Sequence, residues 1–213
     1  MPTRRRALAA LAGVVLPALA GCGTSGGSDG ATTAETEANA ATQTATGTGT
    51  TRTAGGDDEL SITSPAFDDG ASIPAEFTAN GANVSPPLSL SGIPAETTTW
   101  AVVVDDPDAP GGTFVHWLLW NVPADTPSLP RDVQRTETVE SLGGARQGTN
   151  GFGAVGYRGP APPADDGPHT YRFTAHALDR SLDVQAGAKR GALANAMADA
   201  RLATGRLTGT YDR

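Results

Sequence analysis

Cysteine is nearly absent from this chain of 213 residues, in which Cys22 is the single example. A disulfide needs two cysteines, so none can form within the chain. Lysine is equally scarce: Lys189 is the only one, and 23 acidic residues outnumber 15 basic ones. The resulting net charge of −8 disfavours nucleic-acid binding, which depends on basic patches. The excess of acidic groups also predicts a halophilic protein, since dense salt would screen their mutual repulsion.

A hydrophobic run long enough to span a membrane is missing too. The apolar stretch at residues 7–20 is broken by a glycine and a proline and is too short to cross a bilayer comfortably. It follows Arg4-Arg5-Arg6 and ends in Leu19-Ala20-Gly21-Cys22, which resembles a lipobox. We therefore predict that residues 1–22 are a signal peptide of the twin-arginine type and that Cys22 is lipidated. A plain signal peptide that happens to contain a cysteine is the alternative.

Residues 23–56 lack the apolar side chains that a folded core requires. They are nearly all Gly, Thr, Ala and Ser, and such a stretch cannot bury enough surface to offset the entropy lost on ordering. We predict a disordered tether at 23–56 and a folded domain at 57–213. The tether would hold this domain outside the cell, anchored through Cys22 to the outer face of the cell membrane.

The domain contains several strand patterns and one late helical pattern. Apolar strands are predicted at 100–104 and 114–120, on either side of a loop rich in carboxylates, prolines and glycines. Residues 169–178 alternate, which places His169, Tyr171 and Phe173 on one face of a strand and His176 on the other. Apolar residues at helical spacing predict a helix over 187–203 that ends at Gly205, followed by a last strand over 206–211. Short strands separated by turns predict a mostly-β, sandwich-like domain.

Five polar residues stand in otherwise apolar or tightly turned surroundings: Asp106, Asp108, His116, His169 and Tyr171. They allow three interpretations. A metal site is weakly indicated, because no close histidine pair is present. A hydrolase would need a nucleophile, and no serine lies in a Gly-x-Ser-x-Gly sequence. An anion pocket, in which a carboxylate orients one imidazole and the other groups donate to phosphate oxygens, uses every residue. His176 is interpreted as an ordinary sheet histidine.

Two motifs carry a resemblance to a known family. Asp106-Pro107-Asp108-Ala109-Pro110 followed by His116-Trp117 resembles the first signature of the phosphatidylethanolamine-binding protein family. Gly156-Tyr157-Arg158-Gly159-Pro160-Ala161-Pro162-Pro163 followed by His169-Thr170-Tyr171 resembles the second. The segments 64–67, 85–88 and 209–211 are similar to the bacterial and archaeal branch, often called Raf-kinase-inhibitor-like. The resemblance covers residues 60–213, with both signatures in the expected order.

The resemblance implies a large antiparallel sheet packed on a smaller one, with one late α-helix. It also implies a pocket for phosphate, acetate-like anions or phospholipid headgroups. By matching motif positions, the ligand-binding residues would be Asp106, Pro110, His116, Gly159, His169 and Tyr171. Thr170 departs from the family, which usually has arginine between this histidine and tyrosine, so a strong charge is missing near the rim.

The function expected from these observations is an exported, lipid-anchored protein that binds a small anion or phosphate headgroup. It would use no cofactor or metal and perform no catalysis. Its partners would be that ligand and the membrane reached through Cys22. The alternative is a protease inhibitor acting through a surface loop at 123–132. A hydrolase using Asp106 and His116 is the least favoured interpretation.

Overall fold

The structure, a computed structural model, describes residues 59–213. The predicted signal peptide, Cys22 and the predicted tether lie outside these residues. The strands are β1 (Ser61–Thr63), β2 (Leu88–Ser91), β3 (Thr99–Asp106), β4 (Phe114–Pro123), β5 (Ser128–Leu129), β6 (Thr138–Val139), β7 (Ala145–Gln147), β8 (His169–Leu178) and β9 (Arg201–Tyr211). The helices are α1 (Arg190–Met197) and two 3₁₀ helices, η1 (Ala75–Phe77) and η2 (Glu140–Leu142).

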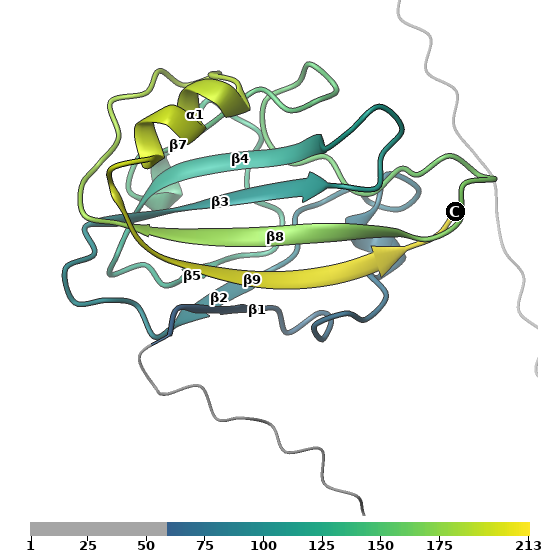
Figure 1. The fold of residues 1–213 in the computed structure, drawn as a ribbon, viewed down its shortest axis with the longest axis horizontal. Coiled ribbons are helices and arrows are strands. Elements are labelled where there is room, and N and C mark those ends of the chain that lie inside the picture. Colours follow the sequence, from purple (N-terminus) through teal and green to yellow (C-terminus); the bar gives the residue numbers. More distant parts are fainter. Residues whose placement is uncertain (1–58) are drawn as a thin grey trace, which may run out of the picture. The chain divides into compact units, whose positions relative to one another are not determined.

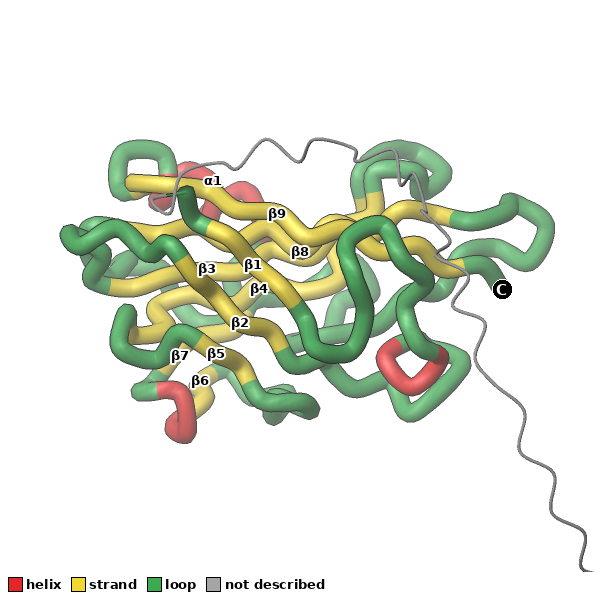
Figure 2. The backbone as a smooth tube through the Cα atoms, turned by 90° about the horizontal axis from the view of Figure 1, so that it is seen from below, coloured by secondary structure: helices red, strands yellow, loops and turns green. Residues whose placement is uncertain are grey.

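The strands form two antiparallel sheets, as the family resemblance implied. The larger sheet has six strands in the order β6-β7-β4-β3-β8-β9, and the smaller has three in the order β1-β2-β5. The long strands β4, β3, β8 and β9 lie side by side (Figure 1). Figure 2, from below, shows β1 and β2 crossing in front of these strands, with α1 behind them.

Both faces of the large sheet are covered near its centre, and β3 shows this most clearly. All eight of its residues are buried. Trp100, Val102 and Val104 pack with side chains of the small sheet in one cluster. Ala101 and Val103 pack with α1 in a second cluster on the opposite face. A strand covered on both sides is expected to be apolar at successive positions, which explains the continuous hydrophobic pattern of this segment.

The prediction of a helix over 187–203 is wrong in length. Helix α1 ends at Met197, and β9 begins at Arg201 and passes through Gly205, which was expected to end the helix. Residues 201–203 were expected to be helical, but they belong to β9, which pairs with β8 along its whole length. This pairing outweighs the helix propensity of the alanines in the segment. Leu193, Met197 and Ala200 nevertheless pack together against the sheet, as their spacing predicted.

The two loops whose motifs resemble family signatures lie at the same end of the large sheet. Because β3 runs antiparallel to both β4 and β8, the loop after Asp106 and the loop before His169 meet at the same end. This is the right-hand end in Figure 1. The segment 123–132, expected to be a surface loop, is partly tied down: β5 pairs with β2, and Leu129 is buried in the core.

Within residues 59–213, no helix has the length and apolarity needed to cross a membrane.

The close approach of β9 to the backbone of Leu60 can be tested at Gly205. A Cβ at Gly205 would lie 2.5 Å from the carbonyl oxygen of Leu60, which is backbone and cannot swing away. We predict that Gly205→Ala lowers the free energy of unfolding by about 1–3 kcal/mol, as overpacking does. Gly191→Ala in α1 is the control, since nothing lies within 4 Å of its added Cβ. Urea titrations of both variants measure the effect, and equal stability would contradict the close approach.

Candidate functional site

A β-bulge in β4 brings His116 to the end of the sheet where the two loops meet. Val104 pairs with Trp117 and Asp105 with Val115, so His116 is an extra residue without a partner on β3. Such a bulge changes the direction of the side chains that follow, and bulges are frequent next to functional sites. The His116 ring consequently lies at 5.2 Å from the ring of Tyr171, at a near-perpendicular angle of 88°.

His169 and Asp106 form a buried pair at the bottom of the site. The Nδ1 atom of His169 lies 2.8 Å from Oδ2 of Asp106, and both side chains are 4% exposed. The Nε2 atom of the same ring lies 3.3 Å from Oδ2 of Asp166. Both ring nitrogens can donate to these carboxylates only when the imidazole carries two protons and a positive charge. Burial lowers the pKa of His169, but hydrogen bonds and charge from Asp106 and Asp166 outweigh it and raise the pKa overall.

Asp106 is held by a second donor that fixes its orientation. Its Oδ1 accepts a hydrogen bond from the backbone N–H of Asp108 at 2.8 Å. The carboxylate of Asp108 in turn accepts from the backbone N–H of Thr170 at 2.8 Å. The first signature is therefore tied to the start of β8 by two carboxylates. The carboxylate of Asp106 therefore contacts the ring of His169.

His116 is in the opposite protonation state. Its Nδ1 lies 2.7 Å from the carbonyl oxygen of Arg158, which only accepts, so Nδ1 carries the proton. Burial lowers the pKa of His116, and this exceeds the opposing effects of the Arg158 carbonyl and the Asp106 charge. The ring is therefore neutral and presents Nε2 as a hydrogen-bond acceptor. The two histidines thus offer complementary chemistry, one donating and one accepting.

These side chains line a cavity of about 250 Å³. Its polar residues are Asp106, His116 and His169. The remaining lining is apolar and consists of Ala109, Pro110, Phe114, Phe152, Ala161, Pro162 and Pro163. A mostly apolar cavity with a few convergent polar groups is typical of small-molecule sites.

Tyr171 lies behind the cavity lining rather than in it. Its side chain is fully buried, and its hydroxyl has no hydrogen-bond partner among the described residues. Burial raises the pKa of Tyr171, and the nearby Asp106 carboxylate raises it further, so the hydroxyl keeps its proton and can donate. A buried, unpartnered hydroxyl costs stability, and such groups in native structures call for a functional explanation.

Gly159 does not line the cavity. Its N–H donates to Oδ1 of Asn83 at 2.9 Å, so the amide expected to face an anion is already used. A Cβ at this position would collide with the backbone carbonyl of Phe77. The close packing of two loops therefore accounts for the glycine. Of the six residues expected to bind ligand, the structure brings Asp106, Pro110, His116, His169 and Tyr171 together, and their ligand-binding role stays a prediction.

Four contributors were missed from the sequence. Phe114 and Phe152 pack edge-to-face at 4.8 Å beside His116, and the Arg158 guanidinium lies 4.3 Å above the Phe152 ring. Asp166 was also missed, although its spacing of three residues from His169 allows contact across a turn. Phe152 lies in a Gly-rich segment just before the second signature, and no local pattern marked it as a site residue.

The other interpretations gain little from this geometry. Asp106 is engaged by His169 rather than by His116, so the Asp–His pair considered for a hydrolase is not formed. Within residues 59–213, no group of three or more His, Cys, Asp or Glu side chains is arranged to hold a metal ion. His176 lies on the opposite face of β8, as its position in the alternation predicted.

Comparison with known proteins agrees with this geometry. The model of the phosphatidylethanolamine-binding protein family matches residues 63–212. The chain belongs to this family. Two solved structures are similar, each covering 73% of this chain and 99% of its own: CT736 of Chlamydia trachomatis, described as a homologue of the family, and YbcL of Escherichia coli. Their sequence identities are 35% and 33%, and their TM-scores are 0.66 and 0.68.

Relatives in sequence extend the comparison. A UPF0098 protein of Pyrococcus abyssi is 40% identical over 159 residues, which cover 75% of this chain and 89% of that protein. A Mycobacterium tuberculosis protein named "Putative lipoprotein LppC" is 40% identical over 211 residues, covering 99% of this chain and 98% of its own. Neither name denotes an enzyme. The match to LppC spans the amino-terminal region as well as the folded domain.

The pair between Asp106 and His169 predicts a pH-dependent stability. The pKa of His169 is raised above 6.5, so the pair's stabilisation is complete below pH 6.5 and is lost as the pH rises through the raised value. Asp106→Asn should remove about 3 kcal/mol below pH 6.5, as breaking a buried ion pair does. It should also flatten the pH dependence. Urea unfolding across pH measures both, with the exposed Asp165→Asn as control. An unchanged slope in Asp106→Asn would show that the pair does not control His169.

Proposed function

We propose that this protein is exported, anchored to the membrane by a lipid on Cys22, and binds a small phosphate-bearing anion without converting it. The observation that carries the proposal is the complementary state of the two histidines at one cavity. The charged ring of His169 supplies a donor and a positive charge, and the neutral ring of His116 supplies an acceptor. A phosphate monoanion carries both acceptor oxygens and a P–OH donor, which matches this pair.

The hydroxyl of Tyr171 supports the same ligand. It keeps its proton, is fully buried, and lacks a partner among the described residues. A phosphate oxygen reaching toward it would satisfy a donor that is otherwise unpaired. The same group explains why a tyrosine, rather than the phenylalanine that packing alone would favour, stands between the two histidines.

Asp166 competes with an incoming anion. Its carboxylate occupies the donor position at Nε2 of His169, and its side chain is 45% exposed. An anion that binds His169 must displace this carboxylate, which remains free to turn into solvent. The affinity for the ligand therefore depends on how much more strongly the ligand anion binds the His169 imidazolium than the Asp166 carboxylate does. This competition favours a moderate affinity over a very tight one.

The size and walls of the cavity restrict what can enter. A volume of about 250 Å³ lies below the roughly 300 Å³ at which pockets for drug-sized ligands begin. Free phosphate or a headgroup such as phosphoethanolamine fits this space, whereas an acyl chain would remain outside. The proline and phenylalanine walls exclude water, which strengthens the charged contacts inside.

Export and anchoring rest on the amino-terminal pattern and on one relative. Leu19-Ala20-Gly21-Cys22 closes a short apolar stretch that follows Arg4-Arg5-Arg6. A relative that covers 99% of this chain is named as a lipoprotein. A lipidated cysteine followed by the tether at 23–56 would hold the binding domain near the outer face of the membrane.

The pocket predicts an affinity for phosphate that falls with rising pH. Binding should weaken as the pH rises above 6.5 through the raised pKa of His169, because the cation is lost. His169→Ala should weaken binding about 30-fold and Tyr171→Phe about 5-fold, since charge-assisted hydrogen bonds are the stronger ones. His116→Ala should also weaken binding. Calorimetric titration of the full chain with inorganic phosphate and with phosphoethanolamine measures these effects.

Asp166 provides the control that separates binding from folding. Asp166→Asn should raise the phosphate affinity, because the competing carboxylate is removed, while Asp165→Asn next to it should leave the affinity unchanged. Tyr171→Phe should not lower the free energy of unfolding, because it removes an unpartnered hydroxyl. Affinity that is flat in pH and indifferent to all of these changes would place the ligand elsewhere.

Membrane anchoring is tested by Cys22→Ser. The serine hydroxyl cannot form the thioether by which a lipobox cysteine is lipidated, so the variant should leave the membrane fraction. Washed fractionation of the producing cells, followed by blotting, measures the change. Retention of the variant on membranes would refute lipidation at this residue, while leaving the pocket proposal untouched.

A further inference from the structure

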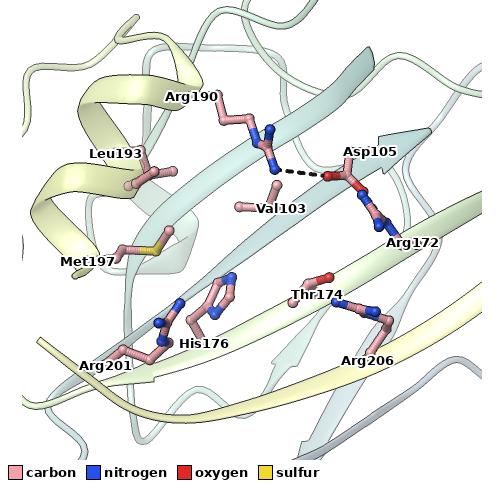
Figure 3. A pocket seen from close by; sticks show the side chains of 11 residues that line it. Val103, Asp105, Arg172, Thr174, His176, Arg190, Leu193, Met197, Arg201 and Arg206 are labelled. Carbon is pink, nitrogen blue, oxygen red and sulfur yellow. Dashed lines mark hydrogen bonds and ion pairs between the residues drawn. The ribbon is translucent and has the colours of Figure 1, made fainter. Parts of the chain in front are cut away.

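A second cavity lies on the other face of the large sheet, between α1 and the strands β8 and β9. It has a volume of about 280 Å³. Figure 3 shows arginine side chains pointing into it from both sides of His176, with Leu193 and Met197 of α1 along one wall. We call this cavity the arginine groove. Helix α1 has only eight residues and ends before it covers β9, which leaves this part of the sheet open.

Positive charge is concentrated in the arginine groove. Arg172, Arg190, Arg201 and Arg206 line it, and Asp105 is the only carboxylate in its lining. Four guanidinium groups against one carboxylate leave an excess of three positive charges, in a chain whose net charge is −8. An acidic chain has many carboxylates available to neutralise such a cluster, yet within residues 59–213 none forms an ion pair with Arg201 or Arg206.

The four arginines fall into two pairs with different surroundings. Arg172 and Arg190 both reach Asp105, at 2.7 Å and 3.4 Å. Arg201 and Arg206 form no ion pair with any residue in the described part of the chain. The first pair is held by a buried carboxylate, whereas the second remains available to an external anion.

His176 lies between Arg201 and Arg206 (Figure 3), and their charges act on its ring. Its ring is buried, and Nδ1 is 3.2 Å from the hydroxyl of Thr204. Burial, together with the positive charges of Arg201 and Arg206, lowers the pKa of His176 to about 4. The ring is therefore neutral at physiological pH and leaves the arginines as the cations of the groove. Arg201 and Arg206 are therefore both close enough to His176 to influence its pKa.

Strand register fixes these residues on one face. Positions Arg172, Thr174 and His176 alternate along β8 with the core residues, so they point toward α1. Arg206 pairs with Thr174 across to β9, which places it on the same face. The groove is therefore built from the sheet itself, and its position does not depend on a mobile loop.

The opposite wall is apolar. Leu193 and Met197 from α1 and Val103 from β3 are buried in the second hydrophobic cluster and border the cavity. One side of the groove therefore suits a hydrocarbon surface and the other a negative charge. The volume restricts the ligand to a small molecule.

We propose that the arginine groove is a second ligand site, for a small organic anion with a phosphate or carboxylate group and a short apolar body. The charged group binds Arg201 and Arg206, whose planar guanidinium groups match the geometry of both anions. The apolar body packs against Leu193 and Met197. This site is separate from the cavity at His116 and His169 and does not depend on the function proposed for it.

Phenyl phosphate and benzoate are suitable probes, because each carries a charged group and an apolar ring. Inorganic phosphate, which has only the charged group, and benzyl alcohol, which has the ring without the charge, are the controls. Calorimetry on the full chain should give tighter binding of a probe carrying both parts than of either half. The double variant Arg201→Gln/Arg206→Gln should weaken that binding at least about 30-fold, because two charge-assisted contacts are lost. Arg131→Gln/Arg180→Gln removes the same charge from exposed arginines outside the groove and should leave it unchanged. Which probe binds more tightly decides between phosphate and carboxylate.

A site-specific signal separates the two cavities. The methyl resonance of Met197 should shift with phenyl phosphate in the full chain and in His116→Ala, but not in the Arg201/Arg206 double variant. A shift that survives the double variant, or equal weakening in both arginine pairs, would overturn the proposal. So would probe binding that perturbs only Phe114 and Phe152, since that places the ligand in the first cavity. Failure of the first-site proposal would instead appear in the His169 and Tyr171 variants and leave the Met197 shift intact.

Discussion

Two adjacent buried carboxylates at the end of β3 constrain the rest of the structure. Asp105 and Asp106 point to opposite faces of the large sheet, and each must find a cation, because an unpaired buried charge is very costly. Asp106 is paired with His169, and Asp105 is paired with Arg172 and Arg190. Both His169 and Arg172 belong to β8, three residues apart and on opposite faces. A shift of the β8 register by one residue would move each to the wrong face, so both pairs hold one register.

The bulge in β4 supplies what regular pairing cannot. Strict alternation would direct His116 away from Asp106 and Tyr171, toward the face covered by α1. The extra residue opposite β3 lets His116 and Trp117 both turn to the core face, where Trp117 donates to Gln147 at 2.6 Å. The neutral imidazole beside a charged one is therefore a product of backbone geometry, with burial and the Arg158 carbonyl fixing its proton.

Much of this arrangement could be predicted from the sequence, and the failures have physical causes. The strands around Asp106 and His116 and the alternation of β8 were readable because local patterns record which face is buried. The end of α1 was not, because residues 198–203 are alanine-rich and only pairing with β8 makes their last part strand. The contact between Phe152 and Phe114 and the lining of the arginine groove both involve segments that are distant in sequence. No local sequence pattern reveals such contacts. Asp166 was within reach, since a carboxylate three residues before a histidine can contact it across a turn.

The two cavities differ in charge, and this difference determines which anions each would prefer. Around His169 stand Asp106 and Asp166, with Asp108 bonded to the next residue, so negative charge exceeds positive charge there. A ligand with two negative charges would be repelled by these carboxylates. A singly charged phosphate, or a zwitterionic headgroup whose ammonium faces them, would be repelled less. In the arginine groove positive charge exceeds negative charge, which would favour anions of higher charge. Asp105 and Asp106 are consecutive residues of β3, and each supplies a carboxylate to one of the two cavities, which lie on opposite faces of the sheet.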